Sequence, residues 1–429
     1  MGKKISQLTI ASFPYEGEDL FAMVEGGGTK AAPLSTLQTF LSGQAYIASA
    51  DKNNFFGNLS ATGSDIQTIV GDISGTRKLT IGAGQANSGT YTTIAGGCGS
   101  SASGNCASIG GGEDHSATGA HSTIAGGEDN TASGACTAVG GGDTNVASGH
   151  LSTIGGGVNN TANGYEATIG GGNINRAAGC RATVAGGQAN NAAACLSFVG
   201  GGYGLSATAV GAFAGGGTLN GACGIQSTVV GGLSNRTTAS NAFIGGGGQN
   251  AVHGLSAAAV GGRLNIASGR TSFIGGGDSN KTSADYAIVV GGLSNTSSAL
   301  SAFVGGGRGN TASGQGTVVG GGRQNTAGAL QSVIVGGTSN TTVGSYSFIG
   351  GGSDNETCGT CSTVVGGGGN EASNNGSFAG GGLSNTAGGV DSTIVGGKSN
   401  LTSGCQSFIG GGYDNSSTGA WGTVAGGGG

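Results

Sequence analysis

The chain has 429 residues, of which 102 are glycine and only 2 are proline, so a collagen helix, which needs glycine at every third position and abundant proline, is excluded. The formal net charge of −5 is small for this length and no basic stripe occurs, so nucleic-acid binding has no electrostatic support. No stretch approaches the roughly 18 uninterrupted apolar residues of a membrane span, and the start of the chain lacks the apolar region of a signal peptide, so we expect no membrane insertion.

The first 45 residues have an ordinary composition and predict a small mixed α/β module. Asp19–Glu25 is typical of a strand, Gly26–Lys30 of a turn, and Ser35 of the N-cap of a helix that follows it. Such a module is too small for a stable core of its own, so we expect residues 1–45 to pack on a partner or on copies of themselves. Residues 46–90 resemble strand–turn units without a strict phase, which indicates a connector.

A period of 15 residues governs most of the remaining chain. Glycine occupies all 23 positions at this spacing from Gly96 to Gly426. Asparagine occupies another phase from Asn130 to Asn415, with Leu205 as its single exception. Such a period is the signature of a repeat architecture, in which each repeat is too short to bury its apolar face alone and must stack on its neighbours.

Each repeat, or rung, is predicted to hold two short strands and two turns. Ile154 lies in one strand, and isoleucine or valine recurs at the equivalent position of other rungs, so this column is the predicted core. Gly155–Gly157 turns the chain, and Asn160–Gly164 returns it as a second extended segment. Residues 91–429 are therefore predicted to form an all-β parallel β-roll or β-helix solenoid of 15-residue rungs.

The asparagine column has two interpretations at the sequence level. It includes Asn130, Asn145 and Asn160. Asparagine tolerates left-handed backbone, and its amide can also form a ladder with the asparagine of the next rung. Sequence alone leaves both roles open.

A pattern of compensating volumes marks one face of the rungs. Phe243, Phe273 and Phe303 share one phase, and each is followed two residues later by glycine. Intervening rungs invert this order, as in Thr228 and Val230. Since residues two apart in a strand share a face, the pattern predicts a packed face and an association of several copies. A recent duplication of 30 residues is the alternative explanation.

The repeat resembles the head repeats of trimeric autotransporter adhesins. The residues that carry this resemblance are Ala132–Gly142, which read Ala-Ser-Gly-Ala-Cys-Thr-Ala-Val-Gly-Gly-Gly, against Ala-x-Gly-x-x-Ser-x-Ala-Ile-Gly in that family. The resemblance implies a left-handed parallel β-roll with three chains side by side. The family period is one residue shorter and lacks the triple glycine, so the turn geometry is expected to differ.

The N-terminus is similar to the leading segment of many bacteriophage fibre proteins. The similarity lies in Lys3–Leu8, Asp19–Val24 and Gly28–Leu37. Together, the two resemblances imply a homotrimeric phage tail or head fibre that assembles in the host cytoplasm and is exposed on the particle surface. Residues 1–45 would attach to other virion proteins, and the distal end would meet a host receptor.

Few residues suggest chemistry. The pairs Glu113–Asp114 and Glu128–Asp129 sit in the same phase on consecutive rungs, where they are either solvated or bridged by a cation such as Ca²⁺. The four histidines occupy different phases, and we expect them on the surface; they are His115, His121, His150 and His253. No nucleophile–base pair and no cofactor site can be proposed, so the chain is interpreted as non-enzymatic.

Two rival functions remain at the sequence level. A surface adhesin could bind host glycans directly through its repeats, and an exposed aromatic column would favour it. An ice-binding solenoid is the third hypothesis, because Thr93, Thr123 and Thr153 form part of a threonine column. Ser108 and Ala138 interrupt that column, which weakens the ice-binding hypothesis.

Overall fold

The computed structural model describes residues 20–25, 28–33 and 78–428 of the chain. These residues form strands and turns and contain no helix. The helix expected after Ser35 lies outside them. The chain falls into two compact units, Met1–Asn130 and Thr131–Gly429.

The first unit contains a hairpin and a set of two-residue strands. Strand β1 (Leu20–Glu25) pairs antiparallel with β2 (Gly28–Pro33), which confirms the strand expected at Asp19–Glu25. The short strands are β3 (Leu79–Thr80), β4 (Ala86–Asn87), β5 (Thr93–Ile94), β6 (Ser101–Ala102), β7 (Ser108–Ile109), β8 (Ser116–Ala117) and β9 (Thr123–Ile124). They begin ahead of residue 91, where the regular repeat starts in the sequence.

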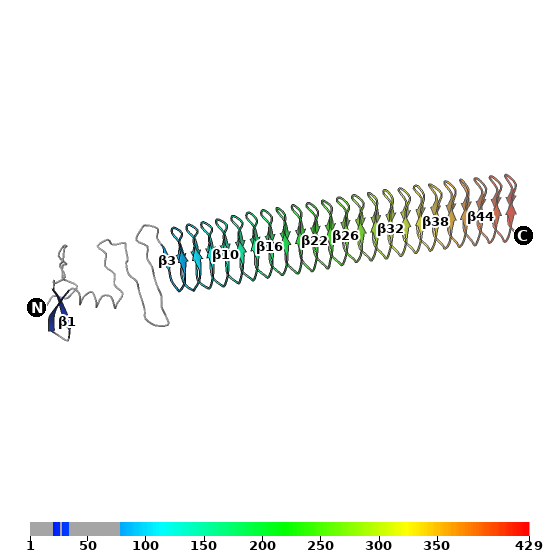
Figure 1. Cartoon of the computed structure of the whole chain (residues 1–429). Helices are drawn as coiled ribbons and strands as arrows, with labels where there is room; N and C mark the ends of the chain where they lie inside the picture. The colour runs from blue at the N-terminus through cyan, green and yellow to red at the C-terminus, as the bar shows by residue number, and fades with distance from the viewer. Residues whose placement is uncertain (1–19, 26–27, 34–77, 429) are drawn as a thin grey trace. The chain divides into compact units, whose positions relative to one another are not determined.

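The second unit is a parallel β-solenoid with two strands in each rung. The even-numbered strands run from β10 (Thr131–Ala132) to β48 (Ser416–Ser417), and the odd-numbered strands from β11 (Ala138–Val139) to β49 (Thr423–Val424). Every strand has two residues and begins 15 residues after its predecessor of the same parity, giving 20 strands in each series. Figure 1 shows these strands as stacked arrows joined by narrow turns. We call the two series the even sheet and the odd sheet.

Strands pair in register with those of the next rung. For example, β13 (Thr153–Ile154) pairs with β15 (Thr168–Ile169), so that Ile154 lies beside Ile169. A third line of isolated bridges, such as Val158 with Asn173, joins the turns between the sheets. The solenoid predicted from the 15-residue period is therefore confirmed.

The core of each rung is thin. In the rung around Ile154, the fully buried side chains are those of Ala147, Ser152, Ile154 and Asn160. One residue of each two-residue strand points inward and the other outward, as the alternation of a β-strand requires. The isoleucine and valine column predicted from sequence is thus the core, and it faces the alanine column of the even sheet.

The turns explain part of the glycine content. We number a rung from the first residue of its even strand, so Thr131 is position 1 and Asn145 is position 15. Glycine at position 12 has left-handed backbone; Gly157 has φ of +94°, and a Cβ there would lie 2.1 Å from the carbonyl oxygen of Gly172. Only glycine allows this close approach between successive turns.

Candidate functional site

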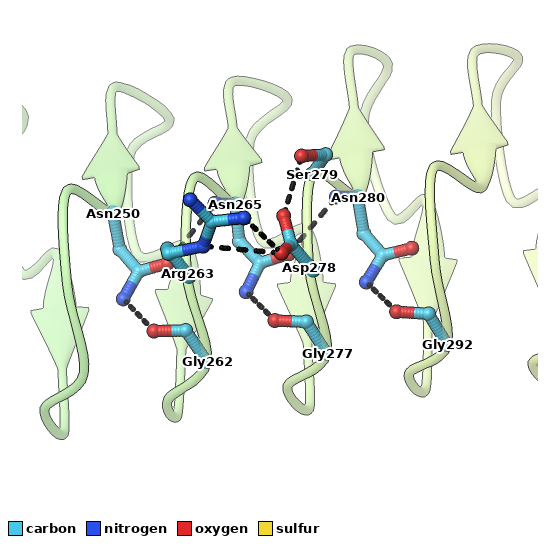
Figure 2. Close-up of polar contacts among 9 residues, drawn as sticks. All are labelled: Asn250, Gly262, Arg263, Asn265, Gly277, Asp278, Ser279, Asn280 and Gly292. Carbon is cyan, nitrogen blue, oxygen red and sulfur yellow. Dashed lines mark hydrogen bonds and ion pairs between the residues drawn. The ribbon is translucent and has the colours of Figure 1, made fainter.

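The asparagine column forms a buried hydrogen-bond ladder along the second unit. The backbone N–H of Asn265 donates to Oδ1 of Asn250 over 3.0 Å. Its own Nδ2 donates to the carbonyl oxygens of Gly261 and Gly277 over 2.9 and 3.0 Å. Figure 2 shows this arrangement repeated from Asn250 to Asn280. Each amide therefore joins its own rung to both neighbouring rungs.

The first residues of the column follow the same pattern. Nδ2 of Asn130 donates to the carbonyl oxygen of Gly126 over 3.1 Å. Oδ1 of Asn145 accepts from the backbone N–H of Asn160 over 3.0 Å, and both side chains are fully buried. Neutral amides do not titrate or attack a substrate, so this network supplies stability rather than chemistry.

The structure decides between the two roles that the sequence left open. The asparagines of the column are absent from the residues with left-handed backbone in the described part of the second unit. The left-handed residue is the one just before, at position 14, such as Asn159 with φ of 56°. The column is therefore asparagine because of its hydrogen bonds.

Leu205 interrupts the ladder, and restoring it is expected to stabilise the protein. The backbone N–H of Leu205 still donates to Oδ1 of Asn190 over 2.9 Å, but its buried side chain has no oxygen or N–H to offer the next rung. We expect Leu205→Asn to raise the free energy of unfolding by about 1 kcal/mol, the typical net value of a hydrogen bond. Urea unfolding measures this. A loss of stability would show that the ladder does not determine the residue at this position.

His115 corrects the expectation that all four histidines lie on the surface. It is only 1% exposed and occupies the asparagine column, 15 residues before Asn130. Its Nδ1 accepts from the backbone N–H of Asn130 over 3.2 Å, as an asparagine Oδ1 would. Its buried Nε2 has no hydrogen-bond partner. The phase shared with Asn130 was the sequence signal that could have identified it.

Burial makes the stability of the first unit depend on pH through His115. Burial lowers the pKa of His115, against a smaller opposing effect of the carbonyls of Gly111 and Gly127. The unfolded chain therefore binds the proton more readily than the native state. The contribution of His115 is complete above its ordinary pKa of about 6.5 and falls by at most about 1.4 kcal/mol per pH unit as the pH drops toward the lowered value.

The pH dependence of the free energy of unfolding that His115 causes is expected to disappear in His115→Asn. Urea unfolding between about pH 5 and 8 measures the slope, with His121→Asn at an exposed position as the matched control. The His121 variant should keep the slope of the wild type. If the free energy of unfolding of His115→Asn varies with pH as in the wild type, His115 is not the cause of the pH dependence.

The four acidic residues do not form a site in the structure. Glu113, Asp114, Glu128 and Asp129 lie on exposed turns. Glu113 and Glu128 face each other through a backbone bridge, whereas Asp114 and Asp129 are left-handed, with φ of 53° and 52°. Within the described part of the chain, no three His, Cys, Asp or Glu side chains are grouped so that they could hold a metal ion.

The two sheets of the second unit have different outer surfaces. The even sheet carries charged residues at position 1, namely Arg176, Arg236, Lys281, Glu356 and Glu371. The odd sheet has outward residues at positions 8 and 10, and none of its 20 rungs has a charged residue at either one. Position 8 holds Thr, Ala, Val, Ile or Phe, and position 10 holds Gly, Ala or Val. We call this surface the apolar face.

Volume compensation on the apolar face has a direct structural reason. The Cε1 atoms of Phe243, Phe273 and Phe303 lie 3.5, 3.4 and 3.4 Å from where a Cβ would sit on the glycine two residues later. Each ring therefore fills the space above position 10. In six of the rungs without phenylalanine, a valine such as Val260 fills it instead. The inference that the two positions share one surface is correct.

The apolar face is not covered within a single chain. The side chains of Phe243 and Phe273 are each 37% exposed, and Val260 is 47% exposed. Phe303 is partly exposed. The packing of this face against another copy, expected from the sequence, thus stays a prediction.

Comparison with protein-family models gives no match to the chain, and comparison with curated proteins gives none either. In the described residues no helix is long and apolar enough to cross a membrane.

Proposed function

We propose that the chain is a non-enzymatic structural subunit of a phage virion fibre, in which three parallel copies form a rod for host attachment. The observation that carries this proposal is the uniformity of the second unit. Each rung is joined to the next by two sheets, a line of bridges and the asparagine ladder. Such a stack resists bending along its whole length, which suits a shaft.

The length of the solenoid supports a function as a spacer between the particle and a receptor-binding end. Twenty rungs stacked about 4.8 Å apart span roughly 95 Å. A rod of this kind would hold a receptor-binding end away from the particle. Residues 1–45, for which the sequence predicts a small mixed α/β module, would dock on other virion proteins, and residues 46–90 would connect this module to the shaft.

Electron microscopy of purified virions tests this proposal. An antibody against residues 1–45 is expected to label the particle where the fibre is attached. An antibody against an exposed turn of the shaft, such as the turn at Arg308, should label points farther from the particle. Virions from the producing host that carry neither label would contradict the assignment.

A surface adhesin that binds host glycans directly is the second candidate. The partly exposed phenylalanine column favours it, because aromatic faces stack on sugars. Binding of host glycans by the isolated protein, weakened at least tenfold in Phe273→Ala and unchanged in the opposite-face variant Lys281→Ala, would favour the adhesin over the fibre.

A further inference from the structure

The glycine at position 11 is invariant although the single chain leaves room for a side chain there. For Gly321, Gly336 and Gly366, no heavy atom lies within 4 Å of where a Cβ would sit. Their φ angles also lie outside the left-handed range that favours glycine. The carbonyl oxygen at this position accepts from the asparagine ladder, but any residue could supply that oxygen. The fold of one chain therefore does not account for glycine at these three positions, whereas left-handed backbone accounts for it at others, such as Gly141, Gly156 and Gly306 with φ of +140°, +156° and +157°.

Position 11 follows position 10 directly, at the edge of the apolar face. We infer that the apolar face and the adjoining glycine column together form the contact between copies of this chain. The inference deepens the proposed fibre, because it names the surface through which the copies associate. The glycines then leave space for the backbone or side chains of the neighbouring copy.

The area of the face is sufficient for a stable contact. With about 200 Å² for a phenylalanine side chain, an exposure near 37% leaves about 70 Å² in water per rung. Eight of the sixteen rungs from Phe198 to Thr423 hold phenylalanine, and six others hold a valine at position 10 that is 47–53% exposed, so these rungs together present on the order of 1,000 Å² in each copy. Specific interfaces bury about 800 Å² per partner. Covering this surface would remove the largest apolar stripe of the unit from water.

The period of the face identifies the occupant as another copy. A partner must match a continuous surface that rises one rung at a time and alternates between phenylalanine and valine rungs over much of its length. This chain itself carries a surface with that rise and that alternation. The lack of charge means that two copies meet without like-charge repulsion, whereas the even sheet would bring Glu356 and Glu371 toward their equivalents.

Charge placed on the apolar face is expected to dissociate the assembly without unfolding the chain. The test variant is Val335→Asp, Val365→Asp and Val395→Asp combined. These valines are 53, 48 and 50% exposed in the single chain, so the new carboxylates can stay hydrated. The matched control places the same three charges on the even sheet as Thr296→Asp, Thr326→Asp and Ser416→Asp. A second variant, Gly336→Val with Gly366→Val, adds volume without charge.

Sedimentation equilibrium of the full-length chain, with far-UV circular dichroism to verify folding, gives the result. We expect the charge variant to associate at least a hundredfold more weakly than the wild type, the glycine variant at least tenfold more weakly, and the control as the wild type does. If the wild type assembles and both face variants assemble equally well, the inference is wrong while the multi-chain fibre stands. Dissociation of the control alone would assign the contact to the even sheet. A folded monomeric wild type would overturn both the inferred contact and the proposed multi-chain fibre.

Discussion

Asn310→Ala is expected to lower the free energy of unfolding by about 3 kcal/mol, since it leaves two backbone groups, the N–H of Asn325 and the carbonyl oxygen of Gly306, without protein partners at about 1–3 kcal/mol each. Nδ2 of Asn310 donates to the carbonyl oxygens of Gly306 and Gly322 over 2.7 and 2.9 Å. Its Oδ1 accepts from the backbone N–H of Asn325 over 3.0 Å. Asn310 and Asn325 are fully buried, so water does not replace the bond between them, whereas the carbonyl oxygen of Gly322 keeps the backbone N–H of Arg308 as a donor.

Two measurements check this expectation. Urea unfolding gives the decrease in the free energy of unfolding of the whole chain. Amide hydrogen exchange shows whether protection falls first in the rungs next to Asn310, as expected because each rung contacts only its neighbours. Ser313→Ala in the next rung, at an exposed position, should change stability by less than about 0.5 kcal/mol. If Asn310→Ala behaves like this control, the ladder is not a source of stability.

Gly322→Ala is expected to be similarly destabilising, by about 3–5 kcal/mol, through backbone strain and overpacking together. Gly322 has φ of +89°, which L-residues rarely adopt. A Cβ there would lie 2.1 Å from the carbonyl oxygen of Gly337 and 2.6 Å from Nδ2 of Asn325. Both are held by the rung-to-rung hydrogen bonds, so neither can move away without a further loss.

Gly248→Ala is the matched control for this substitution. Gly248 lies at position 13, where a Cβ would have only the carbonyl oxygen of Leu233 as a neighbour, at 4.0 Å. Other rungs carry Leu233 and Arg263 at this position. Thermal unfolding should show an unchanged melting temperature for Gly248→Ala and a clearly lower melting temperature for Gly322→Ala. Equal melting of the two variants would contradict the turn geometry.

The period of the sequence was sufficient to predict the solenoid and its core. A strict spacing identifies which residues stack, and the apolar column around Ile154 could only be the interior of that stack. The shared face of Phe243 and Gly245 followed from the alternation of a strand. These features depend on spacing alone, so they required no knowledge of turn geometry.

The remaining features depend on three-dimensional detail that a period does not contain. Left-handed backbone lies at Asn159 rather than at Asn160, and only the turn conformation distinguishes these neighbours. The four histidines occupy different phases and predict surface positions, but the turn geometry buries His115 in the asparagine column. Whether Phe273 is finally buried depends on other chains, which the sequence of one chain does not specify.

The association state of the intact chain tests the account most directly. Sedimentation equilibrium at micromolar concentration, on protein shown to be folded by circular dichroism, is expected to give three times the chain mass of 40.2 kDa. The apolar face would then be covered and the rod would have the stiffness that a fibre requires. A folded species with the mass of one chain would contradict the proposed fibre and the proposed contact together.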